Sequence, residues 1–252
     1  MPPSIITPIL LHTLRTWPHL PSNTWYFITS VTLSFLNRPD EIPKVFQHAI
    51  EKAHTSTEKT SKQDEHLIIA RRMREALVKA AAIGGLPKTI NALLTLKNAT
   101  PAHLMDGPLG FSPTSRPVEI YDVPASQILQ RGQTFFDKVY GKVSRRVMGQ
   151  MDRSGTEDLG LTARLMYGYI LSNTSVLTAA ETSFVLIAGL IPQDVNPQLK
   201  GHLKGAINNG ATIEEVRAVR DIAIRVCEAA GMRALGERSL DGWGWHGEVA
   251  KL

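Results

Sequence analysis

An internal repeat gives the strongest indication of how this chain folds. Residues 74–85 (REALVKAAAIGG) align without a gap with residues 220–231 (RDIAIRVCEAAG), at an offset of 146 residues. Upstream, His48 in PKVFQH corresponds to His202 in PQLKGH, at an offset of 154 residues. A repeated unit of this kind has an apolar face that it cannot bury alone. The sequence therefore predicts two related units, each of which needs a packing partner.

Both units are predicted to be helical. Apolar residues recur with the 3.6-residue period of helices, and strand-like alternation is absent from the sequence. Two capping boxes mark helix starts, one formed by Thr178 with Glu181 and one by Thr212 with Glu215. In each of them the threonine hydroxyl and the glutamate satisfy free backbone N–H groups of the first turn. Pro197 suits the first turn of a third helix. The predicted fold class is all-α.

Composition divides the chain into four parts. A first helical unit is predicted over residues 20–98, and a second over 124–240, which begins with a long helix that continues to Val147. The stretch between them, 99–123, is expected to be an irregular linker because prolines and glycines interrupt it. The last part, 241–252, is a glycine- and tryptophan-rich tail. Exposed tryptophans are costly, so we expect this tail to pack on the body or on another subunit.

Charge and composition exclude several classes of protein. Twenty-eight Lys and Arg against 23 Asp and Glu give a net charge of +5, and the basic residues are dispersed. The densest cluster, Arg71, Arg72 and Arg74, is expected on a solvated helix face, and nucleic-acid binding is not expected. The sequence contains no run of about 18 predominantly apolar residues, so membrane insertion is not expected either. The single cysteine, Cys227, excludes an intrachain disulfide.

His202 is the first candidate for chemistry. It lies on the apolar stripe of its predicted helix with Leu199 and Leu203, so its imidazole is expected to point inward. It can be read as a core histidine bonded to a backbone carbonyl, or as a general acid–base whose pKa a nearby carboxylate brings close to neutrality. Glu181 is the natural carboxylate partner, although its capping position alone explains it. The histidines show no metal-ligand spacing and no phosphate-binding loop occurs, so neither a metal nor a cofactor is expected.

The C-terminal tripeptide carries a different kind of signal. Ala250, Lys251 and Leu252 resemble the SKL-type address that the peroxisomal import receptor reads. The glycine-rich approach to this tripeptide is expected to leave it available to a receptor. The sequence therefore predicts a protein of the peroxisomal matrix.

Two segments carry a family resemblance. The segment LKGHLKGAINNGATIEEVRAVRDIAIRVCEAAGM (199–232) resembles the core motif of the carboxymuconolactone decarboxylase family, which also contains the alkyl hydroperoxidase D proteins. The segment REALVKAAAIGGLPKTINALL (74–94) is similar to the closing helix of the same motif. The resemblance implies two alkyl hydroperoxidase D-like helical units in tandem. It also implies ring-like assembly, so a homo-oligomer is expected, in the form of a trimer of tandem units.

The same resemblance bears on the reaction. His202 matches a functional histidine of the family, whereas Val195 and Gln198 stand where the hydroperoxidase branch has its two cysteines. Thiol-based peroxide reduction is therefore not expected. Ser183 stands where that branch has a glutamate, and Tyr169 replaces the acid of a Trp-Gly-Glu stretch in the decarboxylase branch.

These observations lead to two functional hypotheses. The first is a cofactor-free peroxisomal enzyme, similar to a decarboxylating lyase or an isomerase, that acts on a small carbonyl- or lactone-containing acid. His202 would move the proton, Glu181 would orient the imidazole, and Tyr169, Ser183 or Gln198 would donate a hydrogen bond to the developing enolate. The second hypothesis is a non-catalytic binding or scaffold protein that keeps the family fold.

Overall fold

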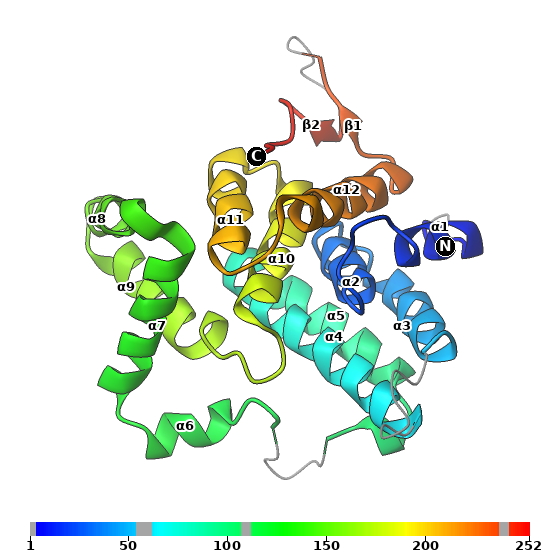
Figure 1. The fold of residues 1–252 in the computed structure, drawn as a ribbon, viewed down its shortest axis with the longest axis horizontal. Helices are drawn as coiled ribbons and strands as arrows, with labels where there is room; N and C mark the ends of the chain where they lie inside the picture. The colour runs from blue at the N-terminus through cyan, green and yellow to red at the C-terminus, as the bar shows by residue number, and fades with distance from the viewer. Residues whose placement is uncertain (1–3, 54–61, 107–111, 237–241) are drawn as a thin grey trace.

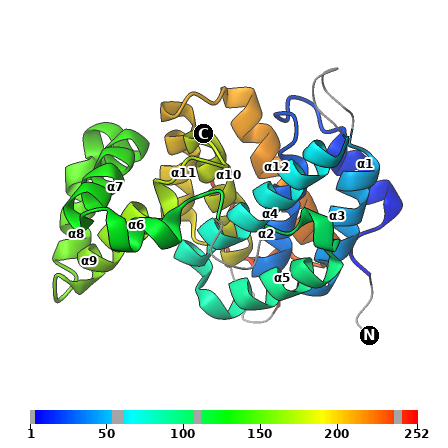
Figure 2. The ribbon, with the colours of Figure 1, turned by 90° about the horizontal axis from the view of Figure 1, so that it is seen from below.

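The structure is a computed structural model that describes residues 4–53, 62–106, 112–236 and 242–252. It is almost entirely helical, which confirms the all-α class (Figures 1 and 2). Parts of the predicted first unit (54–61), linker (107–111), second unit and tail (237–241) lie outside the described residues. The elements are α1 (Pro8–Arg15), α2 (Trp25–Phe35), η1 (Pro39–Glu41), α3 (Ile42–Glu51), α4 (Lys62–Gly84), α5 (Leu86–Ala99), η2 (Ala102–Leu104), α6 (Arg116–Asp122), α7 (Ala125–Tyr140), η3 (Gly141–Val143), α8 (Ser144–Asp152), α9 (Asp158–Leu165), η4 (Met166–Leu171), α10 (Ala179–Leu190), η5 (Ile191–Gln193), α11 (Asn196–Asn208), α12 (Ile213–Ala229), β1 (Arg233–Ala234) and β2 (Gly244–Trp245).

Two buried helices, α2 and α10, form the centre of the molecule. Every residue of α2 is buried, and so is α10 from Thr182 to Leu190. The two helices pack on each other, and the hydroxyl of Thr32 donates a hydrogen bond to the carbonyl of Ala188 at 3.3 Å. Both helices are uncharged over these stretches, as burial requires.

The helices that carry the repeated motif, α4 and α12, have corresponding positions around the pair of α2 and α10. Each of them packs on both α2 and α10, while α3 packs on α2 and α11 packs on α10 (Figure 1). Both α4 and α12 are followed by a glycine in the left-handed region, Gly85 (φ 76°) and Gly231 (φ 93°). Two related units would pack with this kind of correspondence. The tandem organisation and the trimer of tandem units stay predictions.

Helices α7, α8 and α9 lie to one side of the central helices in both views (Figures 1 and 2). The π-helical turn η4 packs closely on α7: a Cβ added to Gly132 would lie 2.5 Å from the backbone nitrogen of Gly168. The prediction of one continuous helix from 124 to Val147 is wrong in one respect. The observed helix α7 ends at Tyr140 because Gly141 has φ 53°, and α8 begins after the 3-10 turn η3. The expectation of an irregular linker is also wrong for α6, where a proline occupies the first helical turn without cost.

The tail after α12 packs on the body. Trp245 is buried and its indole N–H donates to the carbonyl of Ile191 at 2.9 Å, which confirms the expected packing for this tryptophan. Trp243 is half exposed. A parallel pairing of two residues each, Arg233 with Gly244 and Ala234 with Trp245, joins β1 to β2. Among the described residues, none of the helices combines the length and hydrophobicity needed to cross a bilayer.

Candidate functional site

His202 points into the protein, as its position on the apolar stripe predicts. It lies in the second turn of α11 between Leu199 and Leu203, and only 4% of the residue is exposed. Its ring faces the ring of Tyr140 on α7, with 5.9 Å between centroids in an edge-on arrangement. The hydroxyl of Tyr140 in turn accepts a hydrogen bond from Tyr167 at 3.4 Å. The imidazole is therefore enclosed between α11 and an aromatic cluster.

This enclosure makes His202 a weak base. Burial lowers the pKa of His202 from 6.5 to about 4, because the charged imidazolium loses its hydration. Its Nδ1 atom is buried and makes no hydrogen bond with any described residue. The side chain is thus neutral at physiological pH, and within the described part of the chain one of its ring nitrogens has no hydrogen-bond partner.

Glu181, the expected partner of His202, binds other residues. One carboxylate oxygen accepts a hydrogen bond from the backbone N–H of Thr178 at 2.8 Å, which completes the predicted capping box of α10. The other oxygen is paired with Arg72, which also donates to the hydroxyl of Tyr26 at 3.0 Å. No hydrogen bond between described residues joins Glu181 to His202. The structure therefore does not bring these two side chains together.

The three expected hydrogen-bond donors are placed separately as well. The Ser183 hydroxyl is buried and donates to the carbonyl of Ala179 one turn earlier, at 3.5 Å. Tyr169 is half buried in η4, and Gln198 is exposed on α11. No hydrogen bond between described residues links any of these side chains to His202. Cys227 is buried in α12, and burial raises the pKa of its thiol, which keeps the thiol protonated.

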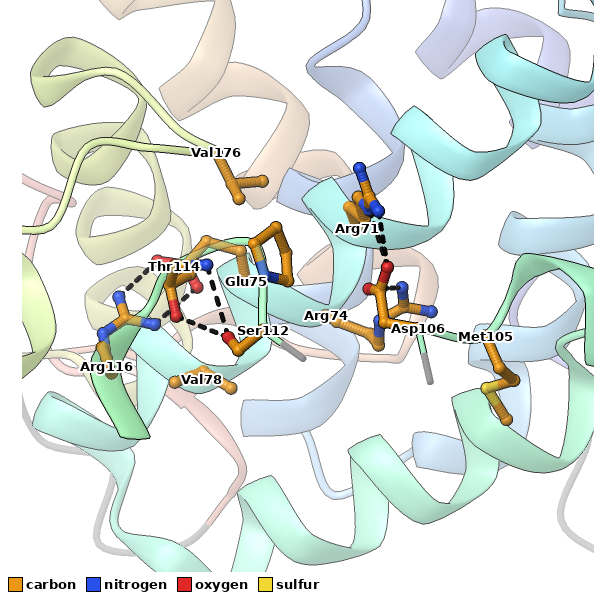
Figure 3. Close-up of a pocket in the computed structure, with 11 residues that line it drawn as sticks. Arg71, Arg74, Glu75, Val78, Met105, Asp106, Ser112, Thr114, Arg116 and Val176 are labelled. Carbon is orange, nitrogen blue, oxygen red and sulfur yellow. Dashed lines mark hydrogen bonds and ion pairs between the residues drawn. The ribbon is translucent and has the colours of Figure 1, made fainter. Parts of the chain in front are cut away.

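A different group of polar side chains converges on a cavity beside α4 (Figure 3). The cavity has a volume of about 300 Å³, which is the lower end of the range for small-molecule sites. We call it the α4 cavity. It is lined by Arg71, Arg74, Glu75 and Val78 of α4, by Met105, Asp106, Ser112, Pro113, Thr114 and Arg116 of the segment that follows α5, and by Val176 before α10.

One end of the α4 cavity is built around Asp106. Its Oδ1 accepts hydrogen bonds from Nε and Nη2 of Arg71 at 2.9 and 2.7 Å, and its Oδ2 accepts one from Nη2 of Arg74 at 2.7 Å (Figure 3). Arg74 also donates to the carbonyl of Leu104 at 3.2 Å. Two guanidinium groups thus share one carboxylate at this end of the cavity.

The other end is an ion pair between Glu75 and Arg116. The guanidinium binds both carboxylate oxygens, through Nη1 to Oε2 at 2.8 Å and through Nη2 to Oε1. Arg116 also donates to the carbonyls of Tyr169 at 2.9 Å and Ile170 at 2.8 Å. This guanidinium therefore has few donors left for a ligand, and its role is to fix the wall of the cavity.

Lys79 lies one turn further along α4 than Glu75 and is fully buried. Its Nζ donates to the carbonyls of Leu171 and Asn173, both at 2.7 Å, and lies 3.6 Å from Oε1 of Glu75. Burial lowers the pKa of Lys79 to about 7, although Glu75 opposes the shift. The ammonium group thus holds the end of η4 against α4.

Sequence reasoning missed the α4 cavity because it placed the arginines on a solvated face. That expectation is wrong: the side chains of Arg71, Arg72 and Arg74 are only 30%, 14% and 25% exposed, and each is ion-paired. Their acidic partners are Asp106 and Glu181, which are 32 to 109 residues away in the chain. Such distant pairing leaves no local pattern; the only signal was three arginines within four residues.

The C-terminal segment is held on the body up to its last two residues. Arg220 of α12 donates to the carbonyls of Val249 at 2.7 Å and Ala250 at 2.8 Å, and the amide N–H of Ala250 donates to Asn196 at 2.7 Å. Val249 and Ala250 are buried, whereas residues 251 and 252 are exposed. The expected availability of the tail therefore applies to its last two residues only.

Comparison with known proteins found two relatives that span most of this chain. The first is "Peroxisomal protein 2" of Schizosaccharomyces pombe, which is 36% identical over 212 residues, covering 84% of this chain and 89% of the relative. The second is "Peroxisomal protein 2" of Saccharomyces cerevisiae, 31% identical over 253 aligned positions, covering 83% of this chain and 89% of the relative. No protein-family model matches the chain, and no solved structure matches it.

Proposed function

The chain belongs to the family of yeast proteins named Peroxisomal protein 2, and from this premise we propose that it is a peroxisomal protein that binds a small molecule in the α4 cavity. The observation that carries the binding proposal is the convergence of Arg71, Arg74, Asp106 and Glu75 on one cavity of about 300 Å³. A concave site with a few convergent polar groups and apolar walls is the usual form of a small-molecule site. The buried pair of Glu75 with Arg116 keeps the wall of this cavity in place without a ligand.

Filling the cavity tests this proposal. We expect compounds from a metabolite library that bind the wild-type chain to raise its Tm by about 3–6 °C at about ten times their Kd. The Val78→Phe variant places a larger side chain in the cavity and should abolish these shifts. The Ile68→Phe variant changes an exposed residue of the same helix that does not line the cavity, and should keep them. Hits that shift the Val78→Phe variant as much as the wild type, or a screen without hits, would contradict the proposal.

A second candidate function is general acid–base catalysis by His202 on a small carbonyl or lactone acid, as in a carboxymuconolactone decarboxylase-like enzyme. One observation favours it: the Nδ1 atom of His202 is buried beside Tyr140 without a hydrogen-bond partner among the described residues, and a catalytic role is one explanation for such an atom in a native protein. If His202 transfers the proton, His202→Gln should lower kcat by about a hundredfold on any acid that the wild type turns over. Equal turnover by both forms would remove this candidate.

We also propose that Ala250, Lys251 and Leu252 direct the chain to the peroxisome by binding the import receptor. The exposure of residues 251 and 252 supports this proposal. Deleting the three residues from a fluorescent fusion that carries its tag at the N-terminus should turn a punctate signal into a diffuse cytosolic one. The Lys251→Arg variant keeps a basic side chain at this position and should stay punctate. Puncta that persist after the deletion would place the address elsewhere in the chain.

A further inference from the structure

Asp106 is an anion in the wall of the α4 cavity that is bound by two arginines of one helix. Its carboxylate accepts three hydrogen bonds, two from Arg71 and one from Arg74, at 2.7 to 2.9 Å (Figure 3). The arginines belong to α4, whereas Asp106 belongs to the segment after η2 and so comes from a different part of the chain. This geometry, with guanidinium N–H groups aimed at both oxygens, is the one by which arginine recognises a carboxylate.

The same place in the cavity suits the carboxylate of a ligand. Arg71 and Arg74 both direct guanidinium N–H groups at the carboxylate of Asp106, and all three residues line the cavity. At the other end, Arg116 binds both oxygens of Glu75 and donates to two backbone carbonyls. Guanidinium groups that hold a carboxylate at the cavity wall can hold the carboxylate of a ligand in the same geometry, so the end formed by Arg71 and Arg74 is where the charged group of a ligand would bind.

The remaining walls indicate the rest of the ligand. Val78, Met105 and Val176 present apolar surface to the cavity, and the hydroxyls of Ser112 and Thr114 bond to each other at 2.8 Å on its far side. In Figure 3 these hydroxyls lie near Arg116 and Glu75, away from the pair of Arg71 with Asp106. A ligand that fits this cavity has an anionic group at one end and a short apolar body. At its other end the cavity can accept a polar group.

We propose that the α4 cavity takes a small carboxylic acid whose carboxylate binds Arg71 and Arg74 in competition with Asp106. Asp106 then acts as an internal substitute for the ligand: it keeps the two guanidinium groups in position and lowers the apparent affinity for acids. This inference rests on the proposed binding function, and it adds the chemical class of the ligand and the group that competes with it.

The test measures how a panel of carboxylic acids of about four to eight carbons, and the matching amides, bind the full-length chain by calorimetric titration. Asp106→Asn removes the competing charge and should tighten binding of the acids about five- to tenfold, while binding of the amides stays unchanged. Arg74→Gln should weaken binding of the acids about tenfold. Asp152→Asn, which breaks a comparable pair with Arg164 far from the cavity, is the matched control and should leave both series unchanged.

The outcomes separate the inference from the proposed function. Acids that bind no better than amides to the Asp106→Asn chain overturn the inference, and so does a panel in which no acid binds to either form. The proposed function survives both results if the library screen yields uncharged compounds whose binding Val78→Phe abolishes. If Asp106→Asn does not fold, Arg74→Gln decides: undiminished binding of the acids to that variant overturns the inference.

Discussion

Replacing Lys79 with methionine is expected to lower the free energy of unfolding by about 3–4 kcal/mol. The ammonium group is fully buried and holds the carbonyls of Leu171 and Asn173, each at 2.7 Å. Methionine fills a similar volume but donates no hydrogen bond, so both carbonyls would stay buried without a partner. Each unsatisfied group costs about 1–3 kcal/mol, and Glu75 also loses a nearby positive charge.

Urea unfolding measures this effect against a matched control. Lys88→Met removes a half-buried lysine that donates to one carbonyl, that of Phe35 at 2.7 Å, and it should cost about 1 kcal/mol or less. A loss in Lys79→Met no larger than in Lys88→Met would show that the end of η4 does not depend on the buried ammonium group.

The second large effect is a loss of stability in mild acid that depends on His202. In the folded chain the pKa of His202 is lowered from 6.5 to about 4 by burial. Between these two pH values the unfolded chain binds a proton that the folded chain cannot accept, so the unfolded state gains stability as the pH falls. The pKa difference corresponds to about 3 kcal/mol of folding stability, present above pH 6.5 and lost as the pH approaches 4.

Comparing the wild type with His202→Gln isolates this contribution. Glutamine has no titratable group, so the free energy of unfolding of the variant should fall less between pH 7 and about pH 4.5 than that of the wild type. Other titrating groups contribute equally to both proteins and cancel in the difference. Identical pH dependence in the two proteins would mean that the imidazole is hydrated rather than enclosed.

Local features of this fold could be predicted from the sequence. The capping boxes of Thr178 with Glu181 and of Thr212 with Glu215 lie where their spacing places them, because each bond joins residues three apart. The inward direction of His202 follows from the apolar stripe of one helix. The helix break at Gly141 could not be predicted in this way. A glycine within an apolar pattern can continue the helix with a negative φ or end it with a positive φ, and the sequence does not show which of the two occurs.

The ion pairs that build the candidate sites could not be predicted in the same way. Glu181 has two oxygens: the sequence accounts for the one in the capping box, whereas the other binds Arg72, which is 109 residues away. The pair of Arg116 with Glu75 spans 41 residues, and the bonds from Arg71 and Arg74 to Asp106 span 35 and 32 residues. Each of these pairs depends on how α4 packs against later segments, which helical periodicity does not specify.

The most direct test of the account compares two variants for binding of one acid that binds the wild type, taken from the carboxylic acid panel. If the α4 cavity is the binding site, Arg74→Gln should weaken the binding of that acid about tenfold. In contrast, His202→Gln should leave its Kd within about twofold of the wild-type value, because His202 does not line the cavity. Weaker binding in His202→Gln together with unchanged binding in Arg74→Gln would contradict the account and place the ligand at the imidazole.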